Sequence, residues 1–333
     1  MIRIGLLGAS RIARAAIIAP ARDIAGVTVT RVAARSIGRA REYADKHGIA
    51  DIESDYAALV ASDDVDLVYN ALPPSEHASW TIAALGAGKH VLCEKPFAMN
   101  ADEARAMVDA AAAAGMFLME AFHYRFHPLF SRIMEILQAG EIGSIKALHA
   151  HFRVPIAFDK DELRYRPELG GGAMMDLGCY PVHWVRTVMG SEPRVRSASV
   201  ERHAAGVDVA LDAELDFAGD VKASVQCAMS ADLPDRLDAR LELVGDIGRL
   251  VVDNPLAPHV GHELVITTTG TSREEVHGDS TYHCQLQHVV DVINDVSAPL
   301  LDGADAIGNM RVLDAIYEMA GMPSSSRMAG RNL

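Results

Sequence analysis

Short apolar runs alternate with helix-like segments over the first 120 residues of the chain. Each run ends in a turn or a polar cluster, which is typical of strands buried on both faces of a parallel sheet. The runs lie at residues 2–7, 27–34, 66–71, 90–93 and 116–120, and the helical segments at 38–47, 55–61, 75–85 and 100–115. This alternation predicts an α/β domain with a doubly wound parallel sheet of the Rossmann type and right-handed crossovers.

The pattern changes after residue 121. Strand-like runs then follow one another with few helices between them. The runs lie at 146–154, 194–203, 207–217, 221–229, 237–244, 249–252 and 263–269, and the helices at 128–138, 283–296 and 307–320. We therefore expect a dinucleotide-binding domain over residues 1–121 and a C-terminal α+β domain over residues 122–333, with a large, mostly antiparallel sheet.

The second sheet has few helices to cover it, so one of its faces should be open. A homodimer, or a dimer of dimers, formed sheet against sheet would cover that face. Residues 324–333 are expected to form a frayed tail or a docking arm.

The strand at 90–93 ends in Glu94, Lys95 and Pro96. Ligands bind at the carboxyl ends of strands in an open α/β sheet. A lysine fixed there by a following proline can direct a hydrogen-bonding cation at a substrate oxygen. The same tripeptide also fits an ordinary surface pair of charges after a strand, and these three residues alone do not separate the two interpretations.

The first strand runs directly into Gly8-Ala-Ser-Arg-Ile-Ala13. A dinucleotide-binding loop needs a glycine for its tight turn, a small residue near the diphosphate, and a small residue for helix–strand packing. Gly8 and Ala13 meet the first and third needs. Ser10 replaces the middle glycine, and its hydroxyl can donate to a phosphate oxygen beside the helix N-terminus. An ordinary strand–helix turn is the alternative.

The second strand is followed by Arg35, Ser36 and Arg39, where an NAD site usually carries an acidic residue for the ribose hydroxyls. An arginine there accommodates a 2′-phosphate, which predicts NADP over NAD. Alternatively, Ser36 simply caps a solvated helix. The residues expected to hold the cofactor lie in the loop and at the ends of the following strands: Gly8, Ala9, Ser10, Arg11, Ile12, Arg35, Ser36, Arg39, Ala71, Leu72, Pro73, His77, Glu94 and Lys95.

A second polar stretch lies in the C-terminal half, at residues 164–183. Three successive glycines at 170–172 let the backbone approach a ligand closely. The buried helix that follows carries Asp176, with Tyr180 four residues on and on the same helical face. A buried carboxylate is costly unless it has a partner. The pair therefore serves either catalysis or a structural hydrogen bond.

Composition narrows the class of protein. Half of the residues are hydrophobic and the net charge is −14, so no basic field exists to attract nucleic acid or an anionic membrane. The longest apolar run, at 110–119, is too short to span a bilayer, and the N-terminus lacks the apolar stretch of a signal peptide. Four scattered cysteines without a CxxC pair fit a cytoplasmic protein. His123 and His127 lack the carboxylate that would complete a metal site, so we expect none.

Four segments together resemble the Gfo/Idh/MocA oxidoreductase family: GASRIA at 8–13, EKP at 94–96, EAFHYRFHP at 120–128 and GGGAMMDLGCY at 170–180. They follow the family's order and spacing over nearly the whole chain. Tyr180 stands where many members have histidine, as in the branch that contains dimeric dihydrodiol dehydrogenase, D-xylose dehydrogenase and glucose–fructose oxidoreductase. The resemblance implies Lys95 and Tyr180 as the catalytic pair with Asp176 nearby, oligomers formed through the open sheet, and no metal. Arg166 departs from the family pattern, so the resemblance does not define the residues of the substrate pocket.

The hypothesis is reversible hydride transfer between a nicotinamide and a carbon that bears a hydroxyl or carbonyl. Tyr180 would act as general acid/base: the pKa of a free tyrosine is about 10, and an adjacent lysine ammonium lowers it. Lys95 would also bind the substrate oxygen, and Asp176 would orient one of the two.

The candidates for binding a small polyhydroxylated substrate offer donors without a carboxylate clamp, which favours a sugar or cyclic diol over a keto acid. Each also fits a structural hydrogen bond. These candidates are His123, Arg125, Arg153, Arg164 and His183.

Two rival functions remain open at this point. A non-catalytic NADP(H) sensor would keep Gly8 and Arg35 but would not need Lys95, Asp176 and Tyr180 together. A sugar–sugar oxidoreductase would keep NADP bound between turnovers, so the cofactor would co-purify with the protein.

Overall fold

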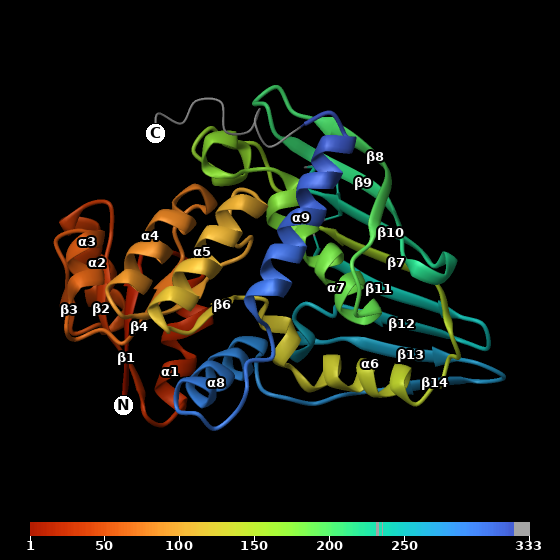
Figure 1. The fold of residues 1–333 in the computed structure, drawn as a ribbon, viewed down its shortest axis with the longest axis horizontal. Helices are drawn as coiled ribbons and strands as arrows, with labels where there is room; N and C mark the ends of the chain where they lie inside the picture. Colours follow the sequence, from red (N-terminus) through yellow and green to blue (C-terminus); the bar gives the residue numbers. More distant parts are fainter. Residues whose placement is uncertain (231–232, 235, 323–333) are drawn as a thin grey trace. The chain divides into compact units, whose positions relative to one another are not determined.

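The structure, a computed structural model, describes residues 1–230, 233–234 and 236–322. These residues form two units (Figure 1). The first comprises Met1–His123 with Tyr282–Ile307, and the second comprises Tyr124–Thr281 with the described residues from Gly308 onward. The predicted second domain began at residue 122 and included Tyr282–Ile307, whereas the structure groups this segment with the first unit. The tail predicted at 324–333 lies outside the described residues.

The first unit contains a six-stranded sheet in which every neighbouring pair is parallel. Its strand order is β3-β2-β1-β4-β5-β6, the order of a Rossmann fold, which confirms the predicted fold class. The strands are β1 (Ile2–Leu7), β2 (Val27–Ala33), β3 (Asp51–Ile52), β4 (Leu67–Asn70), β5 (His90–Cys93) and β6 (Leu118–Glu120).

Helices pack against this sheet, with α4 and α5 side by side and α2 against β2 (Figure 1). Helix α5 begins and ends at the capping residues that the sequence predicts. Asn100 accepts a hydrogen bond from the Glu103 N–H and caps α5, and Gly115 ends that helix with a φ of +64°. The helices are the π-helix η1 (Arg14–Ile18), α1 (Pro20–Asp23), α2 (Ile37–His47), α3 (Tyr56–Ala61), α4 (Pro74–Gly86), α5 (Ala101–Ala114) and α8 (Thr281–Ile293).

The second unit contains an eight-stranded sheet in the order β14-β13-β12-β11-β7-β10-β9-β8. The β7–β10 pair is parallel and the other pairs are antiparallel, which confirms the predicted, mostly antiparallel sheet. The strands are β7 (Ile145–Arg153), β8 (Arg194–Arg202), β9 (Asp208–Asp216), β10 (Lys222–Ala228), β11 (Asp238–Gly245), β12 (Arg249–Asp253), β13 (Glu263–Thr267) and β14 (Thr271–Glu274).

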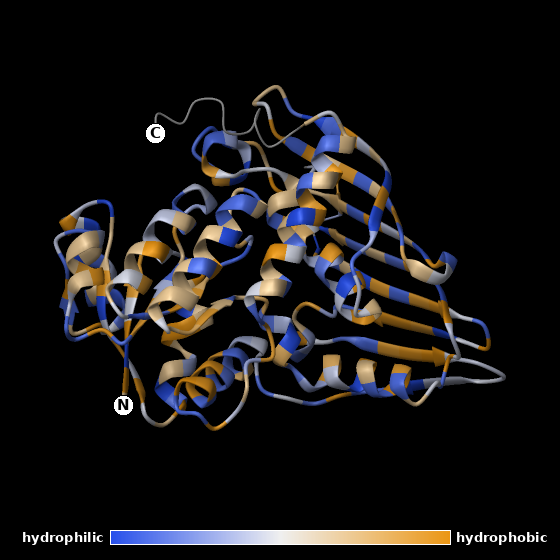
Figure 2. Cartoon of the chain, in the orientation of Figure 1, coloured by the Kyte–Doolittle hydropathy of each residue, from blue (hydrophilic) through white to orange (hydrophobic). Residues whose placement is uncertain are grey.

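One face of this sheet is covered by a helical segment, because η5 and α7 pack on β7 and β10. Apolar and polar residues alternate along the strands (Figure 2). On β7, Leu148, Ala150 and Phe152 are buried while His149 on the other face is exposed. Among the described residues of the second unit, the opposite face is therefore open, as predicted. The remaining helical segments are η2 (His123–Phe126), α6 (Pro128–Gln138), η3 (Leu163–Tyr165), η4 (Pro167–Leu169), η5 (Met174–Gly178), α7 (Cys179–Met189), η6 (Ala218–Asp220), η7 (Pro258–Val260) and α9 (Gly303–Met319).

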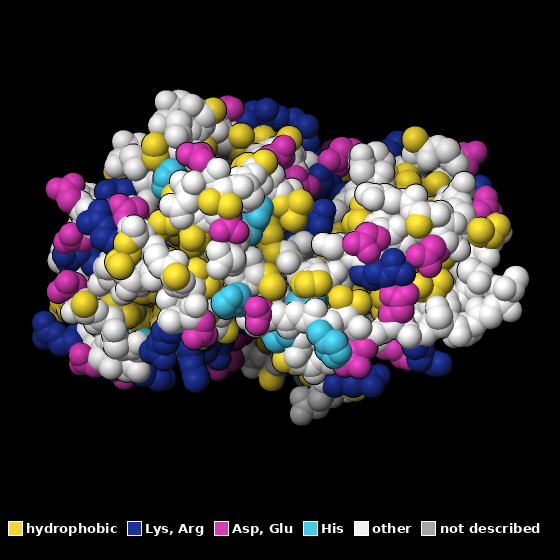
Figure 3. Space-filling model, turned by 90° about the horizontal axis from the view of Figure 1, so that it is seen from below, with side chains coloured by type: hydrophobic (Ala, Val, Ile, Leu, Met, Phe, Trp, Pro, Cys, Tyr) yellow, Lys and Arg dark blue, Asp and Glu magenta, His cyan; other side chains and the backbone are white. Residues whose placement is uncertain are grey.

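Basic and acidic side chains are interspersed on the face of the molecule shown in Figure 3. Within the part of the chain that the structure describes, no helix is both long and apolar enough to cross a membrane. Among those same residues, no group of three or more His, Cys, Asp or Glu side chains is placed to hold a metal ion.

Candidate active site

The loop after β1 has the geometry of a phosphate-binding turn. Gly8 has a φ of +92°, and a Cβ on it would lie 3.2 Å from Leu72 Cδ2 in the loop after β4. Only glycine meets both constraints without strain. The Ser10 hydroxyl accepts a hydrogen bond from the Ala13 N–H at 3.3 Å, which leaves its own proton to donate. The residues present therefore fit a dinucleotide diphosphate.

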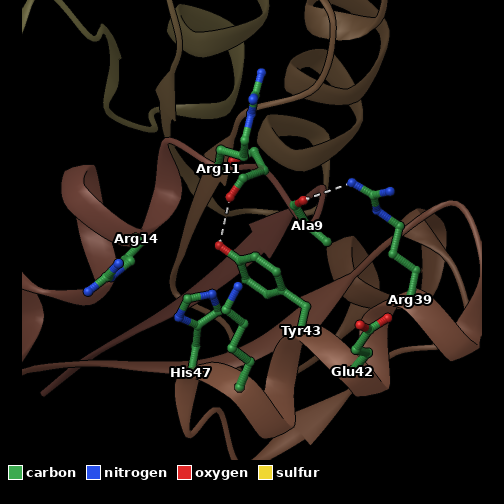
Figure 4. Close-up of a pocket in the computed structure, with 9 residues that line it drawn as sticks. Ala9, Arg11, Arg14, Arg39, Glu42, Tyr43 and His47 are labelled. Carbon is green, nitrogen blue, oxygen red and sulfur yellow. Dashed lines mark hydrogen bonds between the residues drawn. The ribbon is translucent and has the colours of Figure 1, made fainter. Parts of the chain in front are cut away.

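Helix α2 holds this loop from the side of its carbonyl groups (Figure 4). The Tyr43 hydroxyl donates to the Ser10 carbonyl at 2.8 Å, and Arg39 Nη2 donates to the Ala9 carbonyl at 3.3 Å. Sequence reasoning did not single out Tyr43. The available signal was its position four residues after Arg39, which places both side chains on one helical face.

The residues expected to meet a 2′-phosphate are exposed at the carboxyl end of β2. The Ser36 side chain accepts a hydrogen bond from the Arg39 N–H at 3.3 Å, so Ser36 does cap α2. Its hydroxyl proton is still available to a ligand, because the cap uses Ser36 only as an acceptor. The capping role and the phosphate-binding role are therefore compatible.

The ring of His77 lies between the loop after β4 and the loop after β5. Its Nε2 lies 2.8 Å from the Leu72 carbonyl and its Nδ1 lies 3.0 Å from the Pro96 carbonyl. Burial lowers the pKa of His77 to about 4, so the neutral ring has a single N–H and donates it to one of these two carbonyls. Both ring nitrogens face the backbone, so His77 shapes the cofactor region instead of pointing at a ligand. We do not retain it among the cofactor-binding residues.

Lys95 lies between two anchored backbone segments. The buried Glu94 side chain accepts from the Tyr69 hydroxyl at 2.5 Å and from the Lys95 N–H at 3.2 Å. On the other side, the Phe97 N–H donates to Glu120 Oε1 at 2.9 Å. Lys95 itself is partly exposed. The position of its backbone at the end of β5 is thus fixed by two buried carboxylates.

Tyr180 is held by aromatic rings within the second unit. Its side chain is 4% exposed, and its ring lies 5.7 Å from that of Phe152, 6.2 Å from Tyr124 and 6.3 Å from Trp184, measured between centroids. The Tyr124 hydroxyl and His183 Nδ1 are 2.6 Å apart, so these two buried side chains share a hydrogen bond. Edge-on packing of this kind fixes the orientation of the ring.

Asp176 lies in the π-helix η5, immediately before the helix that carries Tyr180. Arg164 Nε donates to Asp176 Oδ2 at 2.5 Å, and Arg164 Nη1 donates to Glu162 at 2.8 Å. Burial opposes the charge on Arg164, but the two carboxylates outweigh it and raise the pKa of the guanidinium. Asp176, which is only partly buried, thus has an ion-pair partner in Arg164.

The predicted substrate residues His123, Arg125 and Arg153 have separate surroundings. His123 stacks on Tyr282 in the first unit, with ring centroids 4.1 Å apart, and the Arg125 guanidinium lies 4.8 Å from the centre of the Phe130 ring. Arg153 Nη2 donates to Gln226 at 2.5 Å on the open face of the sheet. Phe152, the preceding residue, contacts Tyr180 on the covered face, so Arg153 points away from Tyr180. We therefore do not retain Arg153 as a substrate residue.

The sheet order of the first unit and the glycine turn after its first strand are those of a dinucleotide-binding Rossmann domain. Residues 2–122 match the model of an oxidoreductase family with an NAD-binding Rossmann fold, and residues 130–251 match that of the GFO/IDH/MocA C-terminal domain. The chain belongs to the Gfo/Idh/MocA oxidoreductase family. The predicted resemblance is confirmed, and the protein is an NAD(P)-dependent enzyme.

Three known proteins illustrate the relationship. D-xylose 1-dehydrogenase (NADP(+)) 2 of Haloferax volcanii is 34% identical over 320 residues, which are 95% of this chain and 96% of that protein. The trans-1,2-dihydrobenzene-1,2-diol dehydrogenase of Xenopus laevis is 36% identical over 214 residues, 62% of this chain and 63% of that protein. KijD10, a 3-ketoreductase from Actinomadura kijaniata solved with NADP and TDP-benzene, is 27% identical, with a TM-score of 0.87 over 95% of this chain and 97% of that chain.

Proposed function

We propose that this protein is an NADP(H)-dependent dehydrogenase or reductase that interconverts a hydroxyl and a carbonyl on a sugar or cyclic diol. The observation that carries the proposal is the assembly, within the first unit, of the Gly8 turn, the basic end of β2 and Lys95 along the carboxyl ends of a Rossmann sheet. The similarity to an NADP(+)-dependent D-xylose dehydrogenase over nearly the whole chain supports the sugar substrate.

The residues proposed to hold the cofactor lie on three strand ends. The N–H groups of the loop after β1 and the Ser10 hydroxyl bind the diphosphate. Arg35, Ser36 and Arg39 bind the 2′-phosphate, and Leu72 bounds the site after β4. The bound nicotinamide supplies or accepts the hydride.

The protein's own part in the reaction is to move one proton and to orient the substrate carbon. We assign the proton to the Tyr180 hydroxyl as general acid/base. The Lys95 ammonium donates a hydrogen bond to the substrate oxygen and stabilises negative charge that develops there. Asp176, through its ion pair with Arg164, orients the polar groups around Tyr180.

The proposed substrate residues are His123, Arg125, Arg164 and His183. They supply hydrogen-bond donors suited to a polyhydroxylated molecule. A homodimer or dimer of dimers formed through the open sheet, and a cytoplasmic location, stay predictions. The polar pairs on the open face, such as His151 with Asp238 at 2.9 Å, would make such an interface hydrated.

A substrate screen tests the proposed function. Aldoses, keto sugars and cyclic diols would be offered with NADP⁺ and NADPH, and absorbance of the reduced nicotinamide followed. A TDP-linked keto sugar belongs in the screen because of the similarity to the 3-ketoreductase. We expect turnover of at least one sugar or diol. Binding of NADPH without turnover of any compound would instead support a sensor, and NADP that co-purifies through gel filtration would support a sugar–sugar oxidoreductase.

We expect NADP(H) to be preferred over NAD(H) in kcat/KM. Arg35→Asp should reverse much of this preference, since the carboxylate repels the 2′-phosphate and can accept from ribose hydroxyls. Loss of a charge-assisted hydrogen bond predicts a fall in kcat/KM for NADP(H) of about tenfold or more. Arg41→Asp makes the same charge change at an exposed position of α2 and serves as the control. A wild-type enzyme that favours NAD(H) would refute the assignment of Arg35.

A further inference from the structure

The loop after β1, at residues 8–13, is hydrogen-bonded to α2 through two successive carbonyl groups (Figure 4). The Ser10 carbonyl accepts from the Tyr43 hydroxyl at 2.8 Å, and the Ala9 carbonyl accepts from Arg39 Nη2 at 3.3 Å. Both bonds lie on the side of the loop that faces a pocket of about 420 Å³ between η1 and α2. The pocket is lined by Ala9, Ser10, Arg11, Arg14, Arg39, Glu42, Tyr43, Lys46 and His47.

A peptide unit is planar and, when trans, its carbonyl and its N–H point in opposite directions. A hydrogen bond that fixes the Ser10 carbonyl therefore also fixes the direction of the Arg11 N–H. By the same reasoning, Arg39 fixes the Ser10 N–H through the Ala9 carbonyl. The two N–H groups point away from α2, toward the side of the loop where a dinucleotide-binding turn holds its diphosphate.

We infer that Tyr43 is a positioning residue for the cofactor diphosphate: it holds the Ser10–Arg11 peptide so that the Arg11 N–H points at a phosphate oxygen. The inference rests on the proposed use of this loop to bind NADP(H). Arg39 supports the same peptide geometry but is also assigned to the 2′-phosphate, so Tyr43 is the anchor that stays in place when the cofactor binds.

The surroundings of Tyr43 suit this role. The hydroxyl is a donor, as the Ser10 carbonyl requires, and burial raises the pKa of Tyr43 to about 12, so it remains protonated at working pH. The ring packs on His47 with centroids 4.4 Å apart. Phenylalanine would keep that packing and would lose only the hydroxyl, so Tyr43→Phe isolates the hydrogen bond to the loop.

The test measures nucleotide binding by wild-type protein and Tyr43→Phe. NADPH is titrated by its fluorescence, and 2′-phospho-ADP-ribose and adenosine 2′-monophosphate are measured as competitors. We expect the Kd of NADPH and of 2′-phospho-ADP-ribose to rise about tenfold, the effect of misdirecting one charge-assisted hydrogen bond. Adenosine 2′-monophosphate lacks the diphosphate, so its Kd should change less than twofold. The KM for NADPH should rise while kcat at saturation stays within twofold of wild type.

Arg22→Ala is the matched control. Arg22 Nη2 donates to the His47 carbonyl at 3.0 Å, so this variant removes a side-chain bond to the other end of the same helix without touching the loop. Its nucleotide affinities should equal those of wild type. Equal NADPH affinity in wild type and Tyr43→Phe would overturn the inference, as would equal weakening of all three nucleotides. A wild-type protein that binds none of them would instead overturn the proposed cofactor, an outcome distinct from either.

Discussion

Tyr180→Phe is expected to lower kcat by about 10²-fold or more, because it removes the hydroxyl proposed to carry the proton. The ring of Tyr180 is fixed by Phe152, Tyr124 and Trp184. These contacts involve only the ring, so phenylalanine retains them. The KM for the cofactor should therefore change little while the chemical step slows, and a melting temperature close to that of wild type would show that the fold is kept. Steady-state kinetics over a range of pH, together with thermal unfolding, would measure both effects.

The control removes a hydroxyl elsewhere. Tyr56 packs edge-on against Trp80 in the first unit, with ring centroids 5.3 Å apart, and has no assigned part in the reaction. Tyr56→Phe should keep wild-type kcat at saturating cofactor. Turnover of Tyr180→Phe within a few fold of wild type would remove Tyr180 from the mechanism. A loss confined to KM would make it a substrate-binding residue instead.

The sequence predicted most of the first sheet because its strands are buried on both faces and bounded by clear turns. The predicted ranges 2–7 and 90–93 coincide with β1 and β5. β3 was missed because two residues show no period. The assignment of 282–307 to the second domain differs from the observed grouping, since an amphipathic pattern tells that a helix buries one face but not which sheet receives it.

Sequence motifs indicated the backbone geometry around Gly8, which has a φ of +92°, and the position of Lys95 shortly after the end of β5. The sequence motifs did not indicate which side chains hydrogen-bond to backbone groups of other segments. Tyr43 and His77 hold loops through hydrogen bonds to carbonyl groups that are remote in sequence or carry no sequence signature. Such contacts depend on tertiary packing, which single-sequence patterns do not encode.

The two faces of the second sheet explain why Arg153 does not lie beside Tyr180. Arg153 was grouped with Tyr180 by residue type alone, but a strand directs successive side chains to opposite faces. Since Phe152 packs on Tyr180, its neighbour Arg153 must face the other way. The period of β7 already contained this information, and applying it to the candidate list would have excluded Arg153.

Lys95→Met is expected to lower kcat by about 10²- to 10³-fold, the effect of removing one preorganised donor to a developing oxyanion. Methionine keeps the length of the side chain but removes the ammonium. The backbone on either side is held by Glu94 and Glu120, so the loop should keep its conformation. The Kd of NADPH should stay within a few fold of wild type. Lys89→Met is the matched control, since Lys89 precedes the same strand at its opposite end and donates to the Ser62 carbonyl.

A chemical rescue shows whether the lost turnover comes from the missing ammonium group or from a change in the fold. Lys95→Cys, treated with 2-bromoethylammonium, regains an ammonium on a side chain of nearly native length, and much of the lost turnover should return. Burial raises the pKa of the Cys93 and Cys227 thiols, so these react slowly, and wild-type protein treated in parallel controls for the rest.

The double variant Lys95→Met with Tyr180→Phe then decides whether the two residues act in one step. Groups that work as a unit have strongly non-additive effects, so the double variant should be little slower than the worse of the two single variants. Losses that multiply would mean that Lys95 and Tyr180 contribute to separate steps. In that case the proposed transfer of a proton through Tyr180 to an oxygen held by Lys95 would have to be abandoned, even if each residue alone proved essential.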